Sequence, residues 1–485
     1  MKRFRWQAIA ACFLAYATTA VAAPSPAQRT IDEWRQLTEA DVEAAYQLLL
    51  ENHPGSVTSL GDVKFREALE NGYTLALERA TKVDSYLGYT AVLAGFATSF
   101  GDEHIWTNTK LRGIQYRWAG LVTARRGNSW IVAGQERQPD EPDLVGARLV
   151  SCGGEEASSF ADNSLAFRIS ARIEAQYVAH GGFMLVDDGN PFVSRPSECV
   201  FEKDGLSTSM ELNWRLVATP TLAESLQAAV KTDAAGFGIR LVGDTAWVAM
   251  ERLSPEAQPV LDDFLKRRKE LLGSRAIVVD LRGNGGGNSR YGRDLARLIY
   301  GDSFVAAKVR DDSICGAVWR ASAGNAEHLR QIAASASNAD SAKYYRELAD
   351  RMEAAIEAGE AFESPLPDCG DDVPDTGPAS ADEPMPEYTG RVILLTDYVC
   401  FSSCLLMTQD FRRLGALHVG SETNAATRYM EVREIDLPSG LSTFSTLQKV
   451  QLGGAQDIGP FTPHKIAPNG TGNTGDLERW ISNLD

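Results

Sequence analysis

The sequence is poor in positive charge. Its 485 residues include 48 Lys and Arg against 65 Asp and Glu, which gives a formal net charge of -17. An acidic surface of this kind repels nucleic acids and anionic membrane surfaces. We therefore expect neither of these as a partner.

Long apolar runs are also missing, except at the N-terminus. Lys2, Arg3 and Arg5 precede an apolar stretch that ends in the small-x-small pattern Ala20-Val21-Ala22. This pattern is typical of a secretory signal peptide, and the stretch is too short to span a membrane comfortably. We expect residues 1–22 to be removed. The remainder is expected to be exported to the periplasm or the extracellular space, without insertion into a membrane.

Signatures of metal and nucleotide sites are absent from the sequence. No CxxC pair occurs, and no cysteine spacing resembles a zinc site. The glycine-rich stretch at 283–287 has neither the Lys-Ser/Thr of a P-loop nor the Gly-x-Gly-x-x-Gly spacing of a dinucleotide site. We therefore expect no metal and no cofactor.

Six cysteines remain once the leader is removed. An even number in an exported protein favours disulfides, although six cysteines allow 15 pairings. Proximity along the chain suggests Cys152–Cys199, Cys315–Cys369 and Cys400–Cys404.

What the sequence does contain is a buried-strand pattern followed by glycines. The β-branched run at 276–280 is typical of a strand buried on both faces, and Gly285, Gly286 and Gly287 follow it closely. Consecutive glycines are conformationally costly and suit a backbone that must lie close to another group. With phosphate and dinucleotide sites excluded, the oxyanion of an acyl-transfer reaction is the remaining target.

A second buried-strand pattern ends close to a serine pair. Residues 391–396 form the strand pattern, Ser402 and Ser403 lie between two cysteines, and a helical pattern begins near Ser403. A helix N-terminus behind a serine stabilises negative charge that develops there. An ordinary N-cap serine would produce the same pattern, so the position alone does not establish a nucleophile.

Together, the two segments resemble a known family. Asp280-Leu281-Arg282-Gly283-Asn284-Gly285-Gly286-Gly287 is similar to the signature of C-terminal processing peptidases, the tail-specific and tricorn-core serine peptidases. Residues 400–405 align with that family's Thr-x-Ser-Ala-Ser/Ala-Glu box, and residues 420–423 with its Gly-Glu-x-Thr. The resemblance implies Ser402 as the nucleophile. It implies an oxyanion hole formed by the backbone N–H groups of Gly285, Gly286 and Ser403.

The resemblance also implies an architecture. The expected fold is α/β, with a crotonase-like catalytic core, an N-terminal helical region and a PDZ-like β-rich module. The corresponding ranges are 27–104 for the helical region, 112–217 for the module with an insertion near 163–188, and 235–485 for the core with a helical and linker insertion near 318–387.

The choice of general base depends on a missing lysine. One branch of the family uses a lysine about 25 residues after the nucleophile, but residues 405–448 contain no lysine. The tricorn-like branch uses a histidine ahead of the PDZ-like module, and Phe100-Gly101-Asp102-Glu103-His104 resembles that element. The resemblance therefore implies His104 as the base, with His464 as a competitor near the closing motif.

A carboxylate is needed to orient such a histidine. Asp457 lies six residues before Pro463, where tricorn-like members have a glutamate before their closing motif. The resemblance thus implies Asp457 as the orienting acid. Asp102 and Glu103 are alternatives.

The predicted function is that of an exported serine endopeptidase acting on polypeptides. Two other functions stay open. The chain could be a catalytically inactive peptide-binding relative, since Leu405 replaces the glutamate of the serine box. It could also be an esterase-type acyl hydrolase on the same scaffold. The sequence leaves the oligomeric state undetermined.

Overall fold

The computed structural model describes residues 29–484, apart from 111–114, 230–232, 234, 310–315, 368–383, 454–456 and 469. The expected signal peptide and the Cys315–Cys369 pair lie outside these residues. Within them, no helix combines the length and the apolar composition needed to cross a membrane.

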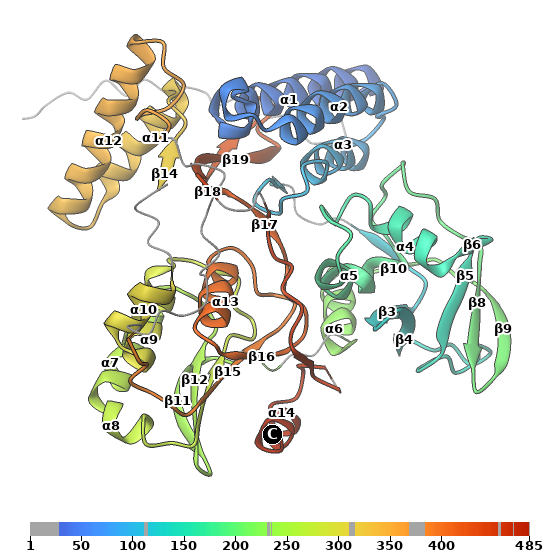
Figure 1. The fold of residues 1–485 in the computed structure, drawn as a ribbon. Helices are drawn as coiled ribbons and strands as arrows, with labels where there is room; N and C mark the ends of the chain where they lie inside the picture. Colours follow the sequence, from blue (N-terminus) through green and yellow to red (C-terminus); the bar gives the residue numbers. More distant parts are fainter. Residues whose placement is uncertain are drawn as a thin grey trace, which may run out of the picture.

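Three N-terminal helices cover an antiparallel sheet (Figure 1, blue). Thr30 and Glu33 form a capping box at the start of the first helix. Apolar residues of the helices and the sheet share one core. The helices are α1 (Ile31–Asn52), α2 (Val63–Ala80) and α3 (Tyr86–Thr98), and the strands are β1 (Thr107–Thr109), β14 (Ala317–Trp319), β18 (Tyr429–Asp436) and β19 (Ser442–Gln451).

A six-stranded sheet forms the centre of the C-terminal half. Its order is β11-β12-β13-β15-β16-β21, and β12 to β21 run parallel. Parallel strands end at the same edge, so the loops after β13 and β15 meet there. The strands are β11 (Phe237–Val242), β12 (Thr245–Met250), β13 (Ala276–Asp280), β15 (Arg391–Thr396), β16 (Leu417–Gly420) and β21 (Lys465–Ile466).

Helices cover both faces of this sheet, which explains why its central strands are apolar throughout. Ile277, Val279 and Leu394 pack against one layer, and Val278 and Ile393 against the other. The first layer contains α7 (Gln258–Lys266), α9 (Arg290–Tyr300) and α13 (Ser403–Arg413), while α14 (Thr474–Ser482) covers the opposite face.

A β-rich module lies to the side of these two parts (Figure 1, right). We use this name for residues 116–217. Its sheet has the order β3-β4-β5-β8-β9, with Cys152–Cys199 joining β5 to β8. The strands are β3 (Leu121–Arg126), β4 (Ser129–Gln135), β5 (Arg148–Cys152), β8 (Glu198–Lys203) and β9 (Leu206–Glu211), with helices α4 (Ala157–Leu165) and α5 (Glu174–His180) packed beside them.

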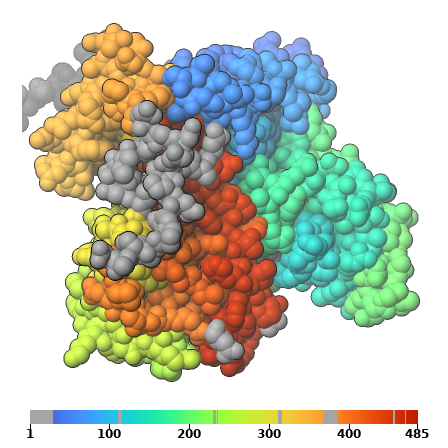
Figure 2. Space-filling model, viewed as in Figure 1, coloured from blue at the N-terminus to red at the C-terminus, as the bar shows by residue number. Residues whose placement is uncertain are grey.

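The predicted helical insertion contains two helices, α11 (Ala323–Ser335) and α12 (Ala339–Glu357), which pack against each other. On the face shown in Figure 2, the C-terminal residues of the core (red) lie next to the β-rich module. The architecture is mixed α/β, which confirms the predicted class at that level.

Candidate active site

The turn that carries Ser402 joins β15 to α13. Ser402 precedes the helix and has φ 56° and ψ -126°, a conformation that few non-glycine residues adopt. Its hydroxyl makes no capping hydrogen bond to the helix. The ordinary N-cap role is therefore not the one that Ser402 fills. Strained backbone at a strand-to-helix turn is a feature of activated serines in other hydrolases.

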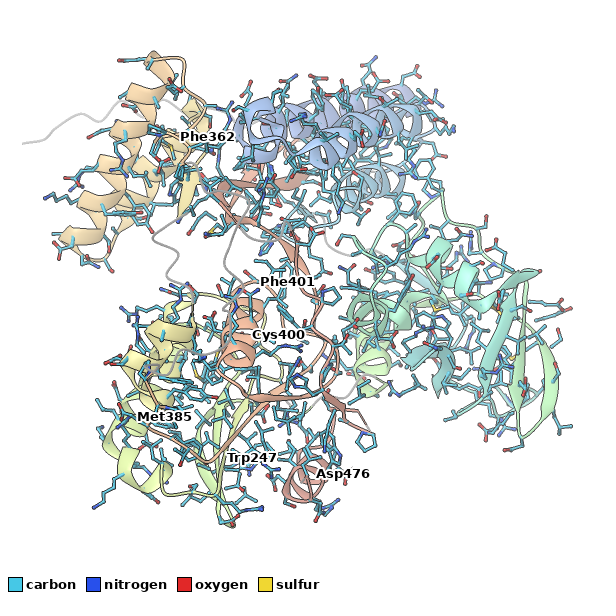
Figure 3. All side chains as sticks on the ribbon, viewed as in Figure 1. Trp247, Phe362, Met385, Cys400, Phe401 and Asp476 are labelled. Atoms are coloured by element: carbon cyan, nitrogen blue, oxygen red, sulfur yellow. A yellow bond between two sulfur atoms is a disulfide. The ribbon has the colours of Figure 1, made fainter. Side chains whose placement is uncertain are left out.

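The predicted disulfide Cys400–Cys404 closes this turn. Both cysteines are fully buried, and they bracket the two serines. Figure 3 places Cys400 and Phe401 near the middle of the molecule.

The glycine loop after β13 packs directly on the serine turn. A Cβ atom on Gly286 would lie 2.7 Å from the Phe401 carbonyl oxygen, 2.8 Å from the Ser402 Cβ and 2.9 Å from the Ser403 nitrogen. Gly286 also has φ +100°, which disfavours any side chain. The sequence thus needs glycine here because two backbones touch.

Two of the three predicted oxyanion donors have N–H groups suited to that role. Ser403 is the first residue of α13, and first-turn N–H groups lack partners inside a helix. Gly285 is exposed, and no described residue accepts its N–H. The Gly286 N–H already donates to the Asn284 Oδ1 at 2.9 Å. Gly286 therefore contributes close packing. The free N–H groups belong to Gly285 and Ser403.

His104 follows α3 and is held by Asp102. The Asp102 Oδ1 lies 2.8 Å from the His104 Nδ1 and accepts from the His104 backbone N–H at 2.9 Å. The other carboxylate oxygen accepts from the Thr427 backbone N–H and hydroxyl. Burial alone would raise the pKa of Asp102, but the hydrogen bonds from His104 and Thr427 lower it below its usual value. A buried, ionised carboxylate therefore holds the Nδ1 edge of the imidazole.

The His104 ring lies against the serine turn. Its centroid is 4.3 Å from that of Phe401, the residue directly before Ser402. Among the described residues, none donates to or accepts from the His104 Nε2. Catalytic hydrogen bonds are often long without substrate and shorten in the complex.

Asp457 lies elsewhere. Its carboxylate is exposed and pairs with Lys64 at 3.5 Å, while its backbone pairs with Thr427 between β17 (Ala426–Thr427) and β20 (Asp457–Ile458). The acid in contact with His104 is Asp102, which the sequence offered only as an alternative. An aspartate two residues before a histidine commonly accepts that residue's backbone N–H in a local turn, and this spacing was the available signal.

The other histidines make structural contacts. Burial lowers the pKa of His53 and of His418 to about 3, so both are neutral in the physiological range. The His464 Nδ1, from the competing candidate, accepts from the His418 backbone N–H at 3.0 Å. His328 contacts Gln448, and His180 faces Glu103.

The Asp397 carboxylate connects the loop after β13 with the turn after β15. Its carboxylate accepts from the backbone N–H groups of Gly283 and Val399, each at 3.0 Å. Burial raises the pKa of Asp397 to about 7, although these two hydrogen bonds oppose the shift. Asp280 raises the pKa further and Arg282 lowers it.

This raised pKa predicts a pH-dependent stability. A raised native pKa means that the folded state binds the proton more tightly than the unfolded state. Protonated Asp397 stabilises the folded state fully below the pKa of the unfolded aspartate, near 4. This stabilisation is lost as the pH rises through about 7. The free energy of unfolding of the wild type, relative to Asp397→Asn, should fall by about 1–3 kcal/mol between pH 5 and pH 8. Urea titrations at both pH values measure it, with the exposed Asp244→Asn as control. A difference that does not change with pH would contradict the assignment.

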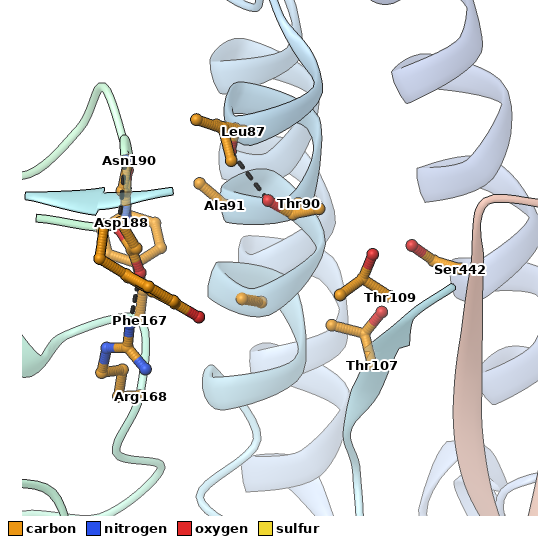
Figure 4. A pocket seen from close by; sticks show the side chains of 12 residues that line it. Leu87, Thr90, Ala91, Thr107, Thr109, Phe167, Arg168, Asp188, Asn190 and Ser442 are labelled. Carbon is orange, nitrogen blue, oxygen red and sulfur yellow. Dashed lines mark hydrogen bonds and ion pairs between the residues drawn. The ribbon is translucent and has the colours of Figure 1, made fainter. Parts of the chain in front are cut away.

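A cavity of about 210 Å³ lies between α3, β1 and the β-rich module (Figure 4). Threonine hydroxyls and apolar side chains line most of it, and its Arg168 and Asp188 pair with each other. None of the predicted catalytic residues lines it. The serine turn, the glycine loop and the segment 102–104 thus lie outside the lining of this cavity.

Comparisons with known proteins give a family match and a similar fold. Residues 244–464 match the model of peptidase family S41. Mature CPAF has a similar fold, with a TM-score of 0.57 and 14% identity, covering 93% of this chain and 97% of that one. Mature CPAF complexed with lactacystin gives a TM-score of 0.56 and 15% identity over 93% and 97% of the two chains. At such identities the similarity concerns the fold alone.

No curated protein sequence matches the chain. The family match includes both β13 with its glycine loop and the Ser402 turn. Through its residues 244–464 the chain belongs to peptidase family S41, which makes it a serine-type peptidase.

Proposed function

We propose that the protein is an exported serine endopeptidase whose site consists of Ser402, His104 and Asp102. One observation carries this proposal. A histidine held by a buried carboxylate lies against the residue next to a serine that has a strained backbone and caps no helix. This arrangement is the general form of a serine, base and orienting acid.

The reaction follows from these contacts. With Nδ1–H donated to Asp102, the His104 Nε2 has a free lone pair and accepts the Ser402 proton as Oγ attacks the peptide carbonyl. The imidazolium is stabilised by the Asp102 carboxylate and then gives its proton to the leaving amine. A water molecule hydrolyses the acyl-enzyme in the same way, with His104 again acting as base.

Negative charge on the carbonyl oxygen requires donors that are already in place. We assign the Gly285 and Ser403 N–H groups to this oxyanion hole. The close packing of Gly286 on the serine turn supports the assignment, because it holds the two donors on adjacent loops.

The orienting acid in this proposal is Asp102 and not Asp457, since the Asp457 carboxylate pairs with Lys64. The β-rich module is proposed to be PDZ-like and to bind peptide by strand addition to its sheet edge. Export is supported by the two disulfides, Cys152–Cys199 and Cys400–Cys404. The core is proposed to be crotonase-like.

A fluorophosphonate probe tests the function directly. It should label the wild type at Ser402, identified by mass spectrometry of the modified peptide, and the same protein should hydrolyse casein. Turnover of p-nitrophenyl esters without cleavage of casein or a peptide library would favour the esterase. Absence of both labelling and turnover would leave the inactive peptide-binding protein.

A further inference from the structure

His104 and Ser402 come from opposite ends of the chain, so something must fix their separation. On the histidine side, the Ser445 hydroxyl donates to the His104 carbonyl oxygen at 2.9 Å and accepts from the Trp106 N–H at 2.7 Å. These bonds fix His104 to β19. They do not reach the serine turn.

Asn424 contacts both sides. Its backbone N–H donates to the Cys400 carbonyl oxygen at 3.1 Å, two residues before Ser402. Its side-chain amide donates to the Glu103 carboxylate, directly before His104. Asn424 is only 6% exposed, so water competes little for these bonds.

The β-rich module supports the same residue from a third direction. The Gln176 Nε2, on α5, lies 3.4 Å from the Asn424 Oδ1. Gln176 is 1% exposed, and its own Oε1 accepts from the Ser170 and Ala171 backbone N–H groups. His180, also on α5, lies 3.8 Å from the Glu103 carboxylate. In Figure 1, α5 is on the side of the module that faces the C-terminal strands.

We propose that Glu103 and Asn424 are positioning residues that hold His104 against the Ser402 turn, with α5 of the module completing the contact. This inference rests on the proposed function. Neither residue needs to touch the substrate. Their effect is on the geometry of the general base, where a displacement of about 1 Å costs on the order of 100-fold in rate.

A reciprocal exchange tests the contact. Asn424→Asp places a carboxylate against Glu103 and removes the donor, so kcat on a short peptide should fall about 30- to 100-fold with KM little changed. Glu103→Gln in that background restores a hydrogen bond with its direction reversed, and should recover at least tenfold of the loss. The acceptor oxygen for Gln176 and for the Ala425 N–H is retained throughout.

A second variant separates positioning from folding. Glu103 is partly exposed, so Glu103→Ala should fold normally, and it should lower kcat about tenfold. Asn163→Asp makes the same chemical change in an exposed Asn–Glu pair of the module, with Glu155, and should leave kcat unchanged. Thermal melts of all variants report whether they fold.

The outcomes distinguish the two proposals. A wild type without Ser402-dependent hydrolysis overturns the proposed function and this inference with it. An active wild type whose Asn424→Asp and Glu103→Ala variants keep full kcat overturns only the inference, as does a folded double variant that recovers nothing. Loss of kcat with recovery in the double variant supports it.

Discussion

Ser402→Ala is expected to lower kcat for peptide hydrolysis by on the order of 10⁴- to 10⁶-fold, with KM nearly unchanged. The hydroxyl supplies the bond to the substrate carbonyl, and no neighbouring group on the turn replaces it. Because the Ser402 hydroxyl makes no capping hydrogen bond, its removal should not weaken α13. Steady-state hydrolysis of a quenched fluorescent peptide measures the loss.

The adjacent serine provides a matched control. The Ser403 hydroxyl donates to the Gly287 carbonyl oxygen and is not proposed to react. Ser403→Ala loses one hydrogen bond, about 1 kcal/mol, and should cost about fivefold or less in kcat. A larger loss from Ser403→Ala than from Ser402→Ala would move the nucleophile by one residue and refute the assignment.

Gly286→Val is expected to cost at least about 10²- to 10³-fold in kcat/KM, comparable to the loss of an oxyanion donor. Its Cβ would lie 2.7 to 2.9 Å from three atoms of the serine turn, and φ +100° is strained for a β-branched residue. The two loops would have to separate, which moves the Ser403 N–H away from Gly285. Hydrolysis and fluorophosphonate labelling rates should fall together, because both reactions develop an oxyanion.

Gly285→Ala is the control for this substitution. A Cβ at Gly285 meets no atom within 4 Å, and its φ lies outside the left-handed region. This variant keeps the backbone N–H that we assign to the oxyanion hole, and its methyl group meets no atom, so kcat/KM should stay within about threefold. If both variants lost kcat/KM equally, any substitution in the glycine loop would be harmful. The close packing of Gly286 on the serine turn would then not be the cause. Circular dichroism melts should confirm that both variants fold.

The parts of the site that could be predicted from the sequence were those encoded locally. The apolar run of β13, its glycines and the Ser402 turn each occupy a short segment, and their patterns are distinctive. The resemblance added His104. At Gly286 the backbone conformation and the close approach of the serine turn dictate the residue type.

The parts that could not be predicted depend on contacts between distant segments. Asp457 fitted a family motif, but its carboxylate meets Lys64 because β20 pairs with β17. Asn424 has no motif and acquires its contacts only when Glu103, Cys400 and Gln176 are brought together by three parts of the fold. Long-range pairings of this kind leave no periodic signal in a sequence.

The pairing of β1 with β19 bears on how the protein is synthesised. His104 and β1 are synthesised early. Thr107 of β1 can pair with Phe444 of β19 only after that much later strand has been synthesised. Such non-local pairing forms slowly and late in folding. A chain that lacks β19 therefore has His104 without the strand that holds its backbone in place. On the proposed assignment of His104 as the base, peptidase activity is therefore expected only after β19 has been synthesised.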